Sequence, residues 1–225
     1  MRVVLSIGGS SINPDGKPDI KFLKEISAIL RKSKHEFGIV TGGGSVARAY
    51  ATAARELGAG EYDADAVAII ATKQNAHVLI AALGDIAHPN VPRTFERARM
   101  HLGKHKVVVM GGTIPGITTD SDSALLAEAV GAKRLVNISN VDAIYEKDPR
   151  KNPNAKKYRK LSYDQLISLA TESDKRTAGT HFVFDMLACK LIARSKLETH
   201  FVSCKNMKDI ANAIEGKEHS GTIVR

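Results

Sequence analysis

Cysteine, tryptophan and long apolar runs are all scarce in this sequence of 225 residues. Its two cysteines, Cys189 and Cys204, lie apart and form no CxxC pair, which argues against a zinc site or a disulfide framework. Apolar runs such as residues 107–110 are far shorter than the roughly 20 residues of a membrane span. No charged and then apolar leader follows Met1. We therefore expect a cytoplasmic protein with no membrane partner.

Aromatic residues are also few, at 5% of the chain with no tryptophan. This scarcity argues against an RNA-binding surface on which bases stack on aromatic rings, although the formal net charge is +9. The basic residues are spread along the chain, apart from a modest cluster within residues 151–160 that is typical of a solvated loop. We expect no nucleic-acid partner. Positive charge suits a small phosphorylated substrate equally well, because a basic cleft attracts anions.

Short apolar segments alternate along the chain with segments of helical periodicity. Such an alternation predicts a mostly parallel central sheet covered on both faces, a three-layer α/β/α sandwich. We expect one domain over residues 1–225. The predicted strands are residues 2–7, 37–41, 106–110, 134–139, 199–203 and 222–224. The predicted helices are residues 20–32, 45–57, 63–82, 94–102, 120–130, 163–170, 182–194 and 207–215.

Glycine clusters follow three of the predicted strands: GGSS after residue 7, GGGS after residue 41 and GGTIPG after residue 110. Each cluster alone is equally consistent with an ordinary turn. In an open parallel sheet, however, ligands bind beyond the carboxyl ends of the strands, and glycine lets backbone amides approach an anion. Together the clusters predict cradles for one polyanionic ligand at a single edge of the sheet.

The type of phosphate site is narrowed by two missing motifs, since the chain has no GxxxxGK[ST] and no GxGxxG. The spacing of its glycine clusters instead resembles the amino acid kinase superfamily. Within that superfamily five segments resemble the successive motifs of the uridylate (UMP) kinases, most closely their archaeal form. These segments are GGGSVAR, YDAD, GGTIPGITTDSDSA, NVDAIYEKDPRKNP and DMLACKLIAR. The resemblance runs essentially over residues 1–225.

This resemblance implies transfer of the γ-phosphoryl group of ATP to UMP, giving UDP and ADP in pyrimidine nucleotide biosynthesis. It implies Mg²⁺ carried by ATP, with no metal ligand assigned to a protein side chain. It further implies an acceptor-binding lobe over about residues 1–132 and an ATP-binding lobe over about residues 133–225. A homo-oligomer is expected, typically a hexamer built from dimers.

Roles for individual residues also come from the resemblance. The implied ATP-binding residues are Gly8, Gly9, Ser10, Gly44, Arg48, Ser139, Asn140, Tyr145 and Asp148. The implied UMP-binding residues are Gly43, Asp65, Thr113, Ile114, Pro115, Gly116, Ile117, Thr118 and Thr119.

The implied catalytic residues are Arg48 and Asp120. A guanidinium suits transfer between phosphates because it keeps its charge and offers several fixed donors. Other interpretations stay open at four positions. Arg48 could be a surface side chain, Asp65 a helix N-terminal acid, Asp120 an N-cap, and Tyr145 a core residue.

The sequence departs from its relatives at two places. Many relatives carry a lysine in the first strand, and bacterial uridylate kinases carry another after the position of Ser139. Here Ser6 and Asn140 occupy those places. Because phosphoryl transfer needs charge stabilisation, we expect Mg²⁺, Arg48 and helix N-termini to supply it, with a lysine from elsewhere as a further candidate.

Two kinds of alternative function remain. One is another small-molecule kinase of the superfamily, such as isopentenyl phosphate kinase, whose GGG loop usually continues into a histidine-bearing motif that GGGSVARAY lacks. The other is a nucleotide-binding storage or regulatory protein without turnover.

Overall fold

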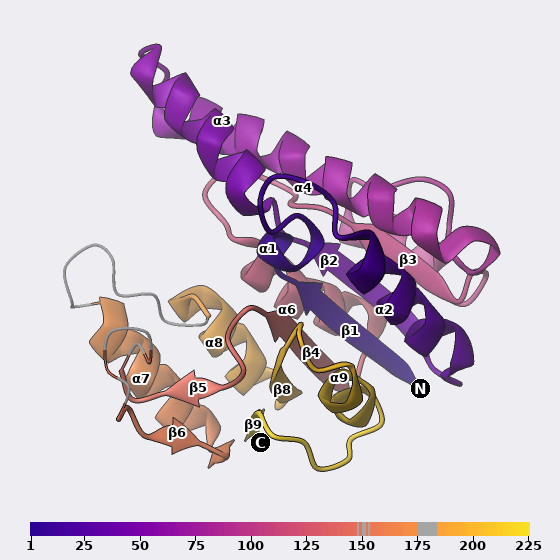
Figure 1. Ribbon diagram of the computed structural model, residues 1–225, viewed down its shortest axis with the longest axis vertical. Coiled ribbons are helices and arrows are strands. Elements are labelled where there is room, and N and C mark those ends of the chain that lie inside the picture. The colour runs from indigo at the N-terminus through magenta and orange to yellow at the C-terminus, as the bar shows by residue number, and fades with distance from the viewer. Residues whose placement is uncertain (148, 150–151, 153, 175–183) are drawn as a thin grey trace.

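The structure is a computed structural model, which describes residues 1–147, 149, 152, 154–174 and 184–225. Its centre is a seven-stranded sheet in the order β3-β2-β1-β4-β8-β9-β7 (Figure 1). The pairs β1–β2, β1–β4, β2–β3 and β4–β8 are parallel, and β8–β9 is antiparallel. The strands are β1 Arg2–Ile7, β2 Glu36–Thr41, β3 Val107–Met110, β4 Arg134–Ser139, β7 Lys160–Leu161, β8 Glu198–Ser203 and β9 Thr222–Val224. The predicted mostly parallel sheet is confirmed.

Helices cover both faces of this sheet, giving three layers (Figure 1). On one face α2, α4 and α9 bury the alternate strand residues Val3, Leu5 and Val136, and on the other face α5, α6 and α8 cover Val4 and Leu135. Strands that are apolar on both faces require this arrangement. The helices are α1 Gly9–Ile12, α2 Ile20–Lys32, α3 Gly44–Glu56, α4 Glu61–Leu83, α5 Phe95–His101, α6 Thr119–Val130, α7 Tyr163–Asp174, α8 Met186–Arg194 and α9 Met207–Ile214, with a 3₁₀ turn at Gly84–Ile86.

Most predicted elements lie within a few residues of their observed bounds, and the differences have local causes. Helix α2 has the predicted bounds because the Asp19 carboxylate accepts a hydrogen bond from the Phe22 amide (2.9 Å) and fixes its start. Helix α8 begins at Met186 instead of residue 182, because Asp185 caps it; residue 182 itself lies outside the described residues. The short elements α1, β5 Ile144–Tyr145, β6 Lys157–Tyr158 and β7 were not predicted, since two to four residues carry no periodic signal.

Helix α4 is long and largely apolar. The stretch Glu61–Ile86 is long and apolar enough by length and composition to cross a membrane, although 33% of its most apolar window is buried in the fold. Charged residues interrupt the sequence at Asp65 and Lys73, which is why no long apolar run was predicted. The helix packs on the sheet through Ala76, Leu79 and Leu83, as a core helix does.

Candidate functional site

A cavity of about 500 Å³ opens at the carboxyl ends of β1, β2 and β4. All three glycine turns reach it. Gly9, Gly43 and Thr118, which belong to three different turns, line the same cavity, as predicted. Its lining residues are Gly8, Gly9, Ser10, Ser11, Gly42, Gly43, Gly44, Ala47, Arg48, Asp65, Ala68, Ile69, Thr72, Gly112, Ile117, Thr118, Thr119, Asp120, Asn137, Ser139 and Asn140.

The first two glycine turns pack backbone against backbone. A Cβ atom added to Gly9 would lie 2.0 Å from the amide nitrogen of Gly44, and one added to Gly42 would lie 2.7 Å from the amide nitrogen of Gly9. Gly44 also has a positive φ of 68°, which favours glycine. These glycines therefore do more than end strands, because any side chain would force the two turns apart.

The N-termini of α3 and α6 both point at this cavity, since Gly43 and Gly44 open α3 and Thr118 and Thr119 open α6. First-turn amides have no acceptor within their own helix, and the helix dipole places partial positive charge there. Two such ends facing one cavity create a site that favours anions.

Arg48 lies in the first turns of α3 and lines the cavity. The cavity lining contains no lysine, so Arg48 is the cationic side chain among the described lining residues. It is exposed and forms no ion pair with any described residue, which leaves its guanidinium available to an incoming anion. Arg48 is a surface arginine, as the alternative interpretation holds, but the surface is the wall of the cavity.

Asp65 and the end of the segment 113–119 form another part of the cavity lining. The Asp65 carboxylate on α4 accepts a hydrogen bond from the Gly116 amide (2.9 Å), and Asp122 on α6 accepts from the Thr113 amide (3.1 Å) and hydroxyl (2.6 Å). The loop is thus held from both sides. Its last three residues, 117–119, line the cavity, whereas residues 113–116 lie outside the lining and Ile114 is exposed.

Asp120 lines the floor of the cavity and is not the N-cap of α6. The cap is Thr118, whose hydroxyl accepts from the Ser121 amide (3.2 Å), so the N-cap interpretation of Asp120 is wrong. Its carboxylate instead accepts from the Ser6 hydroxyl on β1 (3.0 Å). Burial raises the pKa of Asp120 to about 7, against the Ser6 hydrogen bond, and burial likewise raises the pKa of Asp122 to about 6.

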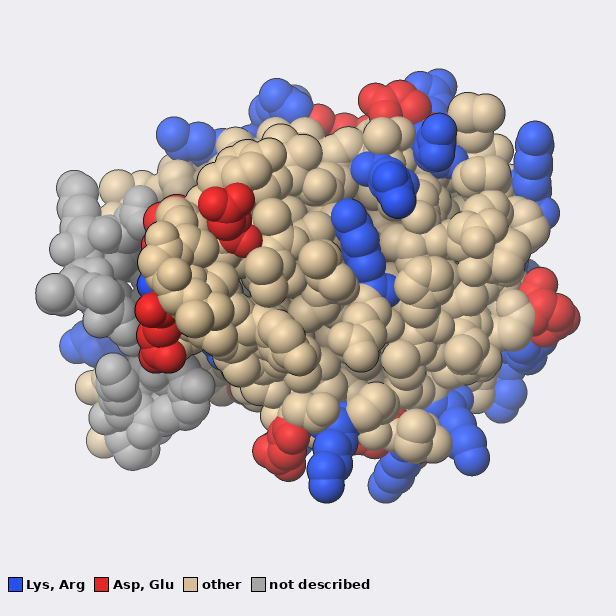
Figure 2. Space-filling view, turned by 90° about the horizontal axis from the view of Figure 1, so that it is seen from above, with Lys and Arg blue, Asp and Glu red and all other residues tan. Residues whose placement is uncertain are grey.

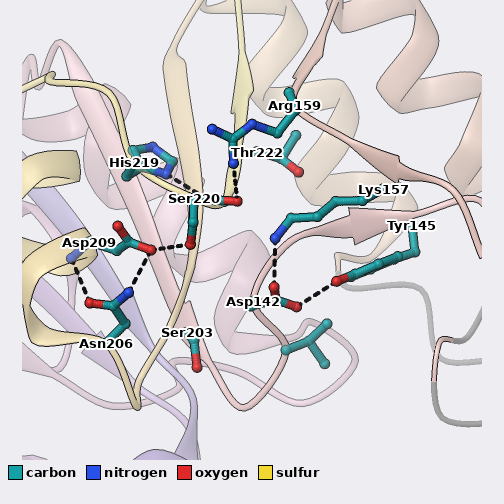
Figure 3. Close-up of polar contacts among 12 residues, drawn as sticks. Asp142, Tyr145, Lys157, Arg159, Ser203, Asn206, Asp209, His219, Ser220 and Thr222 are labelled. Atoms are coloured by element: carbon teal, nitrogen blue, oxygen red, sulfur yellow. Dashed lines mark hydrogen bonds and ion pairs between the residues drawn. The ribbon is translucent and has the colours of Figure 1, made fainter. Parts of the chain in front are cut away.

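The residues predicted on the ATP side fall into separate groups. Ser139 and Asn140 line the cavity at the end of β4. Tyr145 does not line it and lies outside both hydrophobic clusters, so the core interpretation is wrong. Its hydroxyl donates to Asp142 (2.9 Å), which also binds the Lys157 ammonium (2.6 Å; Figure 3). Asp148 lies outside the described residues.

Several polar residues of the site were not predicted from the sequence. Asn137 lines the cavity, is 3% exposed, and its Oδ1 atom has no hydrogen-bond partner among the described residues. The available signal was a polar residue within the apolar strand RLVNIS. Asp185 was quoted within a motif but given no role. Its carboxylate contacts Thr118 and Ser121 at the start of α6, residues more than 60 positions away.

Two buried histidines, His200 and His219, contact each other, and His219 lies beside the Asp209–Ser220 contact shown in Figure 3. The Gly221 amide donates to Nδ1 of His219 (3.0 Å), so the proton of the neutral ring is on Nε2, which contacts Nδ1 of His200 (2.8 Å). His200 in turn contacts Glu198 (2.9 Å). Burial lowers the pKa of His219 to about 4, and the neighbouring His200 acts in the same direction.

This histidine predicts an acid-sensitive contribution to stability. Between its ordinary pKa of about 6.5 and the folded value of about 4, the unfolded chain binds a proton that the folded chain does not. The contribution is fully present above pH 6.5 and is lost as pH falls to 4, by up to about 3 kcal/mol. Asp120 and Asp122 change stability in the opposite direction, because burial raises their pKa values.

The measurement is therefore a comparison of urea unfolding free energies for the wild type and His219→Gln, which cannot be protonated in this range. The advantage of the wild type over the variant should shrink as pH falls from 7.5 to 4.5. A difference that stays constant over this range would contradict the prediction.

Comparisons with known proteins agree with this geometry. Residues 1–203 match the model of the amino acid kinase family. A uridylate kinase of Thermococcus onnurineus is 45% identical over 226 residues, covering 100% of this chain and 99% of the relative. A uridylate kinase of Methanocaldococcus jannaschii is 45% identical over 227 residues with the same coverage.

A crystal structure of the uridylate kinase from Archaeoglobus fulgidus superposes with a TM-score of 0.87 at 39% identity and covers 100% of both chains. The chain belongs to the amino acid kinase family. The relatives and the solved structure just described are all archaeal uridylate kinases, so the resemblance that the motifs indicated is confirmed.

Proposed function

We propose that this protein is a UMP kinase, which moves the γ-phosphoryl group of ATP onto the 5′-phosphate of UMP and gives UDP and ADP. One observation carries the proposal: one cavity brings together the three glycine turns, Asp65, and Arg48, which forms no ion pair with a described residue. Full-length relatives that are uridylate kinases support the same choice of acceptor. The first two turns and Arg48 would hold the phosphates, and the segment 113–119 with Asp65 would hold UMP.

The chemistry asks for positioning and charge stabilisation more than for covalent participation. The acceptor phosphate is already an anion at neutral pH, so no general base is needed. Two unit charges about 4 Å apart at an effective dielectric constant near 20 repel by roughly 4 kcal/mol. Arg48 and the N-termini of α3 and α6 would offset this repulsion, and they would carry most of it because the side chains of Ser6 and Asn140 are neutral.

Mg²⁺ would enter with ATP. In the described part of the chain no group of three or more histidine, cysteine or acidic residues is arranged to hold a metal ion. The oxygen atoms of Asp120 and Asn137 in the cavity are nevertheless the hard donors that Mg²⁺ accepts beside nucleotide phosphates, so the site fits a nucleotide-borne ion. Bound there, Mg²⁺ would neutralise charge on the phosphates.

The two substrates would occupy the two halves of one continuous sheet. The acceptor half, about residues 1–132, contributes β1, β2, β3 and the segment 113–119, and the ATP half, about residues 133–225, contributes Ser139 and Asn140. We infer that Tyr145 belongs to the outer part of the ATP site. The Asp142 and Lys157 contacts would fix the ring of Tyr145 at that place. Asp148 lies outside the described residues, so its assignment to ATP stays a prediction.

A substrate panel tests this function against its rivals. Purified protein with Mg-ATP would be given UMP, CMP, AMP, isopentenyl phosphate or acetylglutamate, and ADP release would be followed. UMP should be turned over far faster than the others. Preference for isopentenyl phosphate would identify a different kinase, and ATP binding without ADP release from any acceptor would identify a storage or regulatory protein.

We also propose a homo-oligomer in which a second copy covers the outer face of α3 and α4. Large apolar side chains are exposed on this hairpin, including Tyr50, Leu57, Tyr62 and Ile70, and Ile70 is 67% exposed. Figure 2 shows the molecule from above the view of Figure 1, and this surface has a broad area with few charged side chains. A helix that is apolar all round normally has all its sides covered.

The length and charge of this face suit a second copy. At 1.5 Å per residue α4 is about 35 Å long and α3 about 20 Å long, so at a width of about 10 Å each they give roughly 550 Å², about two thirds of the ~800 Å² per partner of a standard interface. Asp63 and His77, both exposed, lie seven residues before and after Ile70. An antiparallel pairing of two α4 helices about Ile70 would bring a carboxylate to an imidazole at each end.

Replacing Ile70 with glutamate should dissociate this contact, because it places a charge at the centre of the apolar face. Sedimentation equilibrium should show a smaller assembly for Ile70→Glu than for the wild type. Glu25→Gln on α2 serves as a control that should leave the mass unchanged. A monomeric wild type, or an Ile70→Glu variant of unchanged mass, would contradict the proposal. The hexamer implied by the resemblance stays a prediction, since this contact joins only two copies.

A further inference from the structure

Asp185 joins two helix starts that are far apart in the sequence. Its carboxylate caps α8 by accepting from the Ala188 amide (2.9 Å). The same carboxylate accepts from the Ser121 hydroxyl of α6, at 3.0 and 3.1 Å to its two oxygens, and from the Thr118 hydroxyl. One side chain thus ties α8, in the ATP half, to the first turn of α6, in the acceptor half.

This contact fixes the hydroxyl of Thr118. A threonine hydroxyl has one proton to donate and can accept through its lone pairs. Thr118 accepts from the Ser121 amide (3.2 Å) and gives its one proton to Asp185. In this arrangement the hydroxyl has no proton left for a phosphate, so the part of Thr118 that can donate to an anion in the cavity is its backbone amide.

The charge of Asp185 cannot attract an anion, so its favourable effect comes from the groups that it orients. A carboxylate close to a site for polyphosphates repels them, and its charge also adds to the burial that raises the pKa values of Asp120 and Asp122. A negative charge at this place is therefore unfavourable for binding anions. The favourable contribution that remains is the orientation of Thr118 and of the amides at the start of α6.

We propose that Asp185 is a positioning residue for the acceptor phosphate. By holding Thr118 and Ser121, it sets the cavity wall formed by the N-terminus of α6, and it makes the placement of this wall depend on α8. The proposal rests on the proposed function, since it assigns this wall to UMP. It adds a residue that does not itself line the cavity.

The test uses Asp185→Asn. Asparagine caps helices about as well as aspartate, so α8 keeps its cap. The amide has one acceptor oxygen, and its NH₂ group cannot accept the Thr118 proton. The KM for UMP should rise about tenfold, the effect of one hydrogen bond to a charged group. The KM for ATP and the thermal unfolding midpoint should stay close to those of the wild type.

Asp19→Asn is the matched control, because Asp19 caps α2 in the same way, through the Phe22 amide, and does not line the cavity. It should leave both KM values unchanged. Thr118→Val should raise the KM for UMP as Asp185→Asn does, whereas Thr118→Ser, which keeps the hydroxyl, should have the KM of the wild type. The KM of the double variant Asp185→Asn/Thr118→Val should be no higher than that of the more affected single variant.

Three results would overturn the proposal: an unchanged KM for UMP in Asp185→Asn, an equal rise in the KM for ATP, or additive effects in the double variant. Failure of the proposed function would look different, because the wild type itself would then release no ADP with UMP. Calorimetric titration of UMP into the Asp185→Asn variant gives the same answer without turnover, and a folded variant with wild-type UMP affinity would refute the role.

Discussion

Replacing Arg48 with alanine is expected to lower kcat by about a hundred- to a thousandfold while the fold is retained. The guanidinium is the cation among the described residues that line the cavity, and none of those residues pairs with it. Ser6 and Asn140 are neutral, so neither side chain can compensate for the loss of this charge. Steady-state rates of ADP release with UMP and Mg-ATP measure the effect, and circular dichroism checks the fold.

Arg55→Ala is the control for this variant. Arg55 lies on the same helix, but its guanidinium makes a bidentate contact with Glu61 (2.8 Å for each bond) at the far end of α3. An exposed pair of this kind contributes little to stability, so the Arg55 variant should have nearly normal turnover. If Arg48→Ala also has nearly normal turnover, the charge stabilisation at the transferred phosphoryl group lies elsewhere.

Replacing Gly9 with alanine is expected to lower kcat/KM by at least about a hundredfold, because displacing a reacting group by about 1 Å has an effect of this size. The new Cβ atom would lie 2.0 Å from the amide nitrogen of Gly44, and backbone atoms cannot rotate away as a side chain can. The two glycine turns would have to separate. Overpacking of this kind should also lower the free energy of unfolding by roughly 1–3 kcal/mol.

Gly60→Ala separates a steric cause from a general effect of adding a methyl group. A Cβ atom at Gly60 meets nothing within 4 Å, and its φ of −72° suits any residue. This variant should keep its activity and its unfolding free energy. A Gly9→Ala variant as active as Gly60→Ala would mean that the two turns need not touch for catalysis.

The folding class and the position of the site could be predicted because their signals are local. Strand β1 and helix α2 have the predicted bounds, since apolar periodicity and the Asp19 cap are encoded within a few neighbouring residues. Glycine after a parallel strand marks the ligand edge of a sheet, whatever the rest of the chain does. Gly9 and Gly43 were therefore expected at one edge of the sheet, and the family resemblance added Arg48. All three line one cavity.

Two alternative interpretations, one of Asp120 and one of Tyr145, were wrong because they depended on which partner a polar group meets. Asp120 has the sequence signature of an N-cap, but Thr118 takes that place, and the Asp120 carboxylate contacts Ser6, which is 114 residues away in sequence. Tyr145 carries an apolar ring typical of a core, yet Asp142 and Lys157 hold it outside both hydrophobic clusters. Local patterns cannot show which partner a polar group meets.

The sequence by itself determined that a glycine turn follows each of three strands, that strands and helices alternate as a covered parallel sheet requires, and that the chain shares motifs with the uridylate kinases. Only the tertiary structure decided how the turns touch, that α4 leaves an apolar face uncovered, and that Asp185 holds Thr118 across 67 positions. The physical reason is the separation in sequence over which each kind of interaction acts. Periodicity, capping and glycine conformations act between neighbours in sequence, whereas packing and hydrogen-bond partners exist only once distant segments have been brought together.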